Sequence, residues 1–99
     1  MTSIPNFILE KRSEIYRLAD KYGISNIRVF GSHVRGEAKQ ESDIDLLVHF
    51  DPEITNSGFS FLEFQEEAEK LFNQKVDLVS DRGLSPYIGP YILKEALPL

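Results

Sequence analysis

Cysteine is absent from the 99-residue chain, so the sequence offers neither a disulfide framework nor a thiolate metal site. No run approaches the ~18 consecutive apolar residues that a membrane-spanning helix needs. The first residues, MTSIPNFILEKRSE, lack the basic start and the uninterrupted apolar stretch of a secretory signal. These absences argue against a membrane protein and a disulfide-rich secreted protein, and they fit a cytoplasmic one.

Basic residues are also few: eleven Lys and Arg face sixteen Asp and Glu, which gives a net charge of −5. A field of this sign repels polyanions, so direct binding of nucleic acid is disfavoured, although the acidity could equally serve only solubility. Apolar residues make up 41% of the chain, and no internal repeat or low-complexity tract is visible. A chain of this length can bury somewhat over ~60% of its unfolded surface. We therefore expect one domain, spanning residues 1–99, with a modest core.

Helices and strands are expected to alternate along the chain. Helical spacing of apolar residues predicts an amphipathic helix that starts at Pro5 and is capped by Gly23. The capping-box pattern of Ser60 and Glu63 predicts the start of a later helix. The other predicted elements are strands at 27–30, 44–50 and 75–79, a short helix within 32–37, and loops at 37–42 and 51–58.

A last helix is predicted to start at Ser85-Pro86 and to be kinked at Gly89-Pro90, because a proline inside a helix removes a hydrogen bond. The resulting order indicates an α/β (α+β) fold, in which helices cover a small sheet. The nearly continuous apolar residues of 44–50 require cover on both faces of that strand. The order of the strands does not follow from the pattern.

Two carboxylates, Asp43 and Asp45, stand at the start of the second predicted strand. Side chains two apart on a strand share a face, with Cα atoms ~6.6 Å apart. Asp77 is placed likewise in the third strand, so the three carboxylates converge if these strands are neighbours. Clustered anions need a cation, and oxygen-only ligands favour Mg²⁺ or Mn²⁺. An isolated Asp-x-Asp would more often be a solvated strand entry.

Upstream of these acids, Gly31 and Ser32 form a turn between the first strand and the short helix. Backbone N–H groups at such a turn can face a phosphate, and the missing Cβ of Gly31 lets it approach closely. Arg35 falls on the same side, where its guanidinium could hold phosphate oxygens or could pair with Glu37 or Glu41.

Ten residues separate Ser32 from Asp43, and the order Gly-Ser, ten residues, Asp-x-Asp, with Val34 to Gly36 as VRG, resembles the signature of the DNA-polymerase-beta-like nucleotidyltransferases, especially the minimal nucleotidyltransferases. The resemblance implies a mixed sheet and the metal-dependent transfer of a nucleoside monophosphate, with AMP from ATP as the expected case, to a hydroxyl acceptor. By the same resemblance, the nucleotide-binding residues are Gly31, Ser32 and Arg35, and the catalytic residues that hold two Mg²⁺ ions are Asp43, Asp45 and Asp77.

Minimal members are commonly antitoxins paired with a HEPN-type ribonuclease toxin, so the resemblance implies AMP transfer to a tyrosine of such a toxin. Two alternatives stay open: an antitoxin that only occludes its partner, and a nucleotidyltransferase that acts on a small molecule. His33 and His49 match no family ligand, and Lys39, in the loop between the motifs, is expected to be a solvated lysine, with an approach to the triphosphate as the alternative. A partner is expected to contact the loop 51–58 and the segment that follows Ser85, beside the predicted site.

Overall fold

The computed structural model of the chain describes residues 2–39, 42–50 and 59–99. Its sheet has four strands in the order β3-β2-β1-β4. The strands are β1 (Ile24–Phe30), β2 (Ile44–Phe50), β3 (Val76–Ser80) and β4 (Leu97–Pro98). Strand β1 runs antiparallel to β2 and β4, while β2 and β3 are parallel. The predicted fold class, a small mixed sheet with helices, is confirmed.

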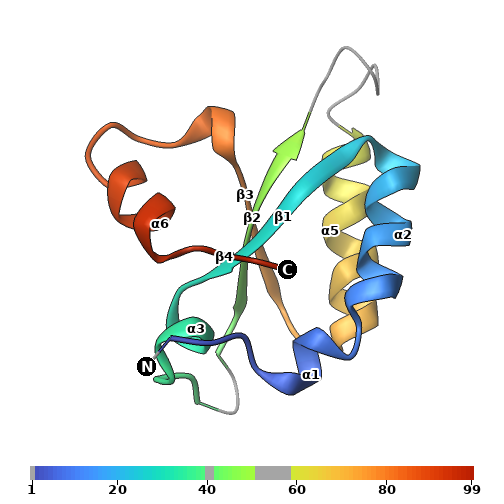
Figure 1. The fold of residues 1–99 in the computed structure, drawn as a ribbon. Helices are drawn as coiled ribbons and strands as arrows, with labels where there is room; N and C mark the ends of the chain where they lie inside the picture. The colour runs from blue at the N-terminus through green and yellow to red at the C-terminus, as the bar shows by residue number, and fades with distance from the viewer. Residues whose placement is uncertain (1, 40–41, 51–58) are drawn as a thin grey trace.

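The helices lie on both sides of this sheet (Figure 1). They are α1 (Asn6–Leu9), α2 (Arg12–Tyr22), α3 (Ser32–Arg35), α5 (Phe59–Phe72), the 3-10 turn η1 (Asp81–Gly83) and α6 (Gly89–Glu95). Helices α2 and α5 pack side by side over one face, and α6 lies on the opposite side. Of the helices that the structure describes, none has the length and hydropathy to cross a membrane.

The core fills the space between the sheet and the α2–α5 layer. From β2, the side chains of Ile44, Leu46 and Val48 are completely buried there. They meet completely buried side chains of both helices and of β1: Ile15, Ala19, Ile27, Val29, Phe64 and Ala68. Because side chains alternate along a strand, Asp45 and His49 of β2 point to the other face of the sheet. One strand thus supplies both the core and the polar face.

The N-terminal prediction of one long helix was wrong. The helical path is broken at Lys11, which divides it into α1 and α2, and Pro5 precedes α1 instead of starting the helix. Residues near the N-terminus contact α3 instead: the Ser3 N–H donates to the Val34 carbonyl at 3.2 Å, and the Phe7 ring meets the His33 ring edge-on. These tertiary contacts, which local periodicity does not encode, favour the break. Gly23 does cap α2, as predicted.

The C-terminal prediction of a helix kinked at Gly89-Pro90 was also wrong. Helix α6 begins at Gly89 with Pro90 in its first turn, where the missing N–H of proline is harmless. Strand β4 was not predicted, since it has two residues and no pattern of its own. Ser60 lies inside the first turn of α5 and does not precede the helix. The expected loop 51–58 lies outside the described residues.

Candidate functional site

Two of the three predicted carboxylates are brought together by the pairing of β2 with β3. In the parallel register, Asp45 lies directly opposite Asp77. Asp45 is partly buried, Asp77 is exposed, and Asp43 is an exposed residue immediately before β2. The sequence left open whether the third strand neighbours the second; the structure shows that it does, and this pairing places an acidic pair on the sheet.

The environment of Asp45 disfavours its negative charge. Burial, followed by the charges of Asp77 and then Asp43, raises the pKa of Asp45 from 3.8 to about 6, although His33 and Arg35 act in the opposite direction. A carboxylate in this position gains from any cation that approaches it. All three acids offer hard oxygen atoms, the donors that Mg²⁺ and Mn²⁺ prefer.

The three acids do not form a closed cluster as they stand. Within residues 2–39, 42–50 and 59–99, no group of three His, Cys, Asp or Glu side chains is gathered tightly enough to hold a metal ion. The geometry is that of a side-by-side pair, Asp45 and Asp77, with Asp43 acting on it through its charge. This open pair is the part of the chain that could hold a cation.

Gly31 sits against the Asp45 carboxylate. A Cβ atom built on Gly31 would lie 1.9 Å from Asp45 Oδ2, which is far inside van der Waals contact. Its backbone also has φ +82, a conformation that side chains other than hydrogen rarely adopt. Only glycine fits here, and its use brings the Gly31-Ser32 turn directly beside the acidic pair.

The donors of this turn already bind a carboxylate of the chain, that of Glu95. The Gly31 N–H donates to Glu95 Oε2 at 3.1 Å, and Arg35 Nη1 donates to Glu95 Oε1 at 2.5 Å. Arg35 Nε donates to Glu37 at 3.1 Å, which confirms the ion pair that the sequence offered as an alternative. Glu41 lies outside the described residues. Glu95 was missed because it is remote in the sequence and carries no motif.

The two histidines have structural partners. His33 is buried, and its Nε2 lies 3.2 Å from the Ser42 carbonyl. His49 Nδ1 lies 3.1 Å from Asp81, whose carboxylate is also 4.0 Å from the Arg28 guanidinium. This Arg28, His49 and Asp81 cluster was not predicted, because it joins three different elements.

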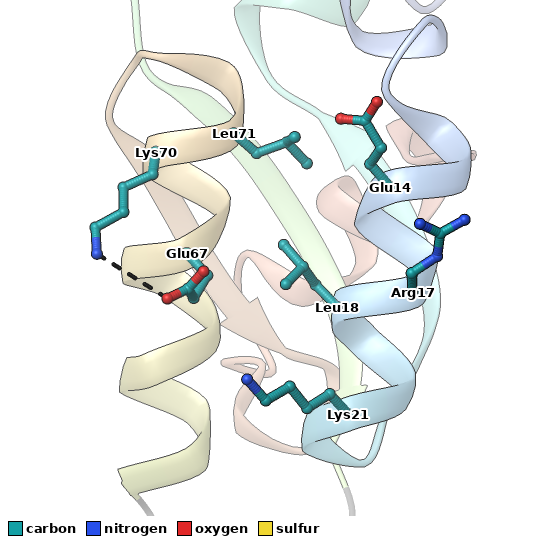
Figure 2. Close-up of a pocket in the computed structure, with 7 residues that line it drawn as sticks. All are labelled: Glu14, Arg17, Leu18, Lys21, Glu67, Lys70 and Leu71. Carbon is teal, nitrogen blue, oxygen red and sulfur yellow. Dashed lines mark ion pairs between the residues drawn. The ribbon is translucent and has the colours of Figure 1, made fainter.

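A groove between α2 and α5 lies on the other side of the sheet (Figure 2). Its walls are Glu14, Arg17, Leu18 and Lys21 from α2 and Glu67, Lys70 and Leu71 from α5. None of the predicted nucleotide-binding or catalytic residues lines it. The groove belongs to the helical layer, so it is not the candidate site.

Comparison with known proteins covers nearly the whole chain. Residues 11–97 match the sequence family described as the nucleotidyltransferase domain. The chain is also similar to the protein adenylyltransferase MntA of Thermococcus cleftensis. The two are 44% identical over 80 residues, which make up 81% of this chain and 79% of the relative.

Solved structures give the same picture of the fold. The structure of a candidate minimal nucleotidyltransferase is similar to this one with a TM-score of 0.82 and 35% sequence identity, over 98% of this chain and 97% of that one. A complex of a tri-AMPylated Shewanella oneidensis HEPN toxin with an MNT antitoxin also matches, with a TM-score of 0.66 and 22% identity, over 91% of this chain and 69% of the matched chain. At that identity, the second likeness concerns the fold alone.

Proposed function

The chain belongs to the nucleotidyltransferase domain family and is a nucleotidyltransferase, and from this premise we propose that it transfers AMP from ATP to a hydroxyl group of a partner protein. The observation that carries the proposal is the position of Asp45, which lies opposite Asp77 and against Gly31. Two carboxylates and the Gly31-Ser32 turn thus meet at one place. The similarity to a protein adenylyltransferase supports AMP and a protein acceptor over other combinations.

In this proposal Asp43, Asp45 and Asp77 hold two Mg²⁺ ions, with Mn²⁺ as a substitute. The fit is supported by the oxygen-only donors and by the raised pKa of Asp45, whose anion is poorly stabilised by the protein alone. Bound divalent ions would supply charge stabilisation for the oxygens that enter and leave phosphorus. The carboxylates of the chain would fix where that charge is placed.

The Gly31 N–H, the Ser32 hydroxyl and the Arg35 guanidinium would hold the β and γ phosphates of ATP. An arginine can bind phosphate oxygens through two parallel hydrogen bonds, which orient the group as well as attract it. Arg35 and Gly31 already bind two oxygens of one carboxylate, which supports their ability to bind an anion together. Held in this way, the α phosphate would lie near the acidic pair.

The reaction would proceed by in-line displacement. The acceptor oxygen would form a bond with the α phosphorus, while the bond from that phosphorus to the bridging oxygen of the β phosphate breaks. Pyrophosphate leaves with the bond's electron pair, and the acceptor's proton passes to Asp77. The exposure of Asp77 supports this role, because a large acceptor must reach it.

The proposed acceptor is a tyrosine of a HEPN-type toxin, and the chain would act as the antitoxin. A similar fold occurs in the complex of an AMPylated HEPN toxin with an MNT antitoxin. The segment after Ser85 carries four exposed apolar side chains, which we call the α6 patch: Tyr87, Ile88, Tyr91 and Leu93. Exposed aromatic and aliphatic residues of this kind are typical of protein interfaces. The expected contact through 51–58 lies outside the described residues.

The test is to express the chain with the product of the neighbouring gene, as the candidate partner, and to weigh that partner by mass spectrometry. We expect the partner to gain one or more AMP units with the intact chain and none with the Asp43→Asn and Asp45→Asn double variant. The matched control is Asp20→Asn, which removes an exposed carboxylate from α2 on the opposite side of the sheet. Its partner should carry AMP as before.

If the double variant still suppresses toxicity, and if neither it nor the intact chain places AMP on the partner, the result would support an antitoxin that only occludes its partner. Transfer of radiolabel from ATP to a small molecule, with none to the partner, would support a nucleotidyltransferase that acts on a small molecule. The metal assignment is tested separately by calorimetry with Mn²⁺ and ATP. If the double variant binds them as tightly as the parent, the metal site lies elsewhere.

A further inference from the structure

The Glu95 carboxylate joins the end of α6 to the turn beside the acidic pair. Each of its oxygens has a donor: one accepts from the Gly31 N–H and the other from Arg35. The Glu95 side chain is mostly buried, with 21% of its surface exposed. It lies 64 positions from Gly31 in the sequence. Its hydrogen bond, followed by that of Glu37, raises the pKa of Arg35. The Glu95 carboxylate is thus an anion bound by two donors, the Gly31 N–H and the Arg35 guanidinium.

These two donors are also the ones that the proposed function gives to the β and γ phosphates. A carboxylate and a phosphate group both present anionic oxygens to N–H donors, so they compete for the same hydrogen bonds. The single N–H of Gly31 can serve one strong acceptor at a time. The carboxylate of Glu95 therefore occupies part of the space and all of one donor that a triphosphate would need.

We propose that Glu95 is an internal competitor of the nucleotide's phosphates, which determines how strongly the Gly31 and Arg35 donors bind them. The inference rests on the proposed function, whose phosphate assignment it makes more specific. Binding of a triphosphate then requires Glu95 to leave both donors. The affinity is lowered by the fraction of molecules in which the carboxylate stays bound. Ligands without β and γ phosphates do not meet this competition.

The competition has a consequence for α6, because Glu95 is the last residue of that helix. Tyr91 and Leu93 of the α6 patch belong to the same helix and are exposed. A protein bound to the patch and a triphosphate bound to the turn would thus act on one short element. Coupling of this kind is reciprocal: a partner that draws Glu95 away strengthens nucleotide binding by the same factor by which the nucleotide strengthens partner binding.

The experiment compares binding of inorganic tripolyphosphate, ATP and AMP to the parent and to Glu95→Gln by calorimetry. The amide keeps the size of the side chain and removes its charge. We expect tripolyphosphate and ATP to bind roughly tenfold more tightly to the variant, and AMP to bind equally to both. Glu37→Gln is the matched control, since Glu37 pairs with the same arginine but does not touch Gly31. Its effect should be less than threefold.

A second measurement uses the parent chain and does not depend on the folding of a variant. Addition of tripolyphosphate should shift the NMR signals of the Gly31 amide and the Arg35 Nε–H, and it should move the Glu95 side-chain signal toward that of an exposed glutamate. Unchanged Glu95 signals at saturating tripolyphosphate would overturn the proposal. The proposal would also be overturned if Glu95→Gln bound tripolyphosphate as tightly as the parent or more weakly. Glu95 would then hold Arg35 in the position that binds phosphate.

Failure of this inference can be told apart from failure of the proposed function. AMP transfer to the partner by the parent chain tests the function and does not depend on what Glu95 does. If the parent transfers AMP but Glu95→Gln binds tripolyphosphate no more tightly than the parent, the competitor role would be overturned and the reaction would stand. Absence of tripolyphosphate binding by either protein would overturn the competitor role together with the phosphate assignment.

Discussion

On the face of the sheet that α2 and α5 cover, the β2 side chains Ile44, Leu46 and Val48 are completely buried. On the opposite face, Asp45 and His49 of the same strand are partly exposed and meet charged groups. Both faces come from seven consecutive residues. The difference shows that alternation along a single strand separates the residues that hold the fold together from those proposed to carry the chemistry.

The separation is incomplete at two positions. Leu47 is completely buried and Phe30 nearly so, although both point to the site-bearing face. Apolar side chains next to Asp45 exclude water from it, and burial is the largest cause of its raised pKa. The site-bearing face therefore combines polar side chains with buried apolar ones. Substitutions on the two faces should consequently have opposite effects on activity and on stability.

The largest expected effect is that of Asp45→Asn on AMP transfer. The substitution removes a carboxylate from the proposed cation site, and several kcal/mol of transition-state stabilisation correspond to a rate reduction of about 10³-fold. The free energy of unfolding at pH 7 should not fall, because the lost charge is disfavoured by burial and by Asp77. Single-turnover transfer assays and urea unfolding measure the two quantities. Transfer within tenfold of the parent would remove Asp45 from the mechanism.

The neighbouring residue should behave in the opposite way. Leu46→Ala leaves a cavity under the α2–α5 layer and should lower the free energy of unfolding by about 2–5 kcal/mol. Protein that remains folded should keep its nucleotide affinity. Leu62→Ala on the exposed side of α5 is the control and should change stability by less than about 0.5 kcal/mol. Equal effects of the two leucines in urea unfolding would contradict the assigned core.

Substitutions in the turn should distinguish ATP from AMP. Ser32→Ala and Arg35→Ala remove contacts proposed for the β and γ phosphates, so ATP affinity should fall, by roughly tenfold to a hundredfold for the arginine. AMP affinity should change much less, and Arg35→Lys should restore only part of the loss because it lacks the planar fork. Arg17→Ala, on the groove side of α2, serves as the control. Calorimetry that finds equal losses for ATP and AMP would reject the assignment.

The smallest expected effect is on stability as a function of pH. Because the folded chain raises the pKa of Asp45 from 3.8 to about 6, it holds this proton more tightly than the unfolded chain does. Stability from this group is complete below pH 4 and is lost as the pH rises through 6. Since the carboxylate is only partly buried, solvent screening limits the loss to about 1 kcal/mol.

The measurement is the difference in unfolding free energy between the parent and Asp45→Asn at pH 4 and at pH 7, with EDTA present. The difference isolates Asp45 from other groups that titrate in this range. A parent that gains stability relative to the variant as the pH rises would mean that Asp45 is stabilised as an anion.

Local sequence signals predicted most of the fold near the site. The bounds 44–50 of β2 were predicted as the structure has them, because an apolar run with no breaker has clear ends. Gly31 was predicted to allow the close approach of a phosphate, whereas the group that the structure shows against Gly31 is the Asp45 carboxylate. The parts that were missed depend on distant residues: the break between α1 and α2, the start of α6 at Gly89, and the two-residue strand β4.

The sequence by itself determined which residue types make up the candidate site. Spacing two apart assigned Asp43 and Asp45 to one face of a strand, and the glycine of the turn allowed the backbone conformation and the space that the carboxylate needs. Only the tertiary structure decided which groups meet there. The parallel pairing of β2 with β3 set Asp45 opposite Asp77, and the return of the chain through α6 placed Glu95 on Gly31 and Arg35. Such contacts join residues 32 to 64 positions apart, so they arise from packing of the whole sheet and leave no local pattern to read.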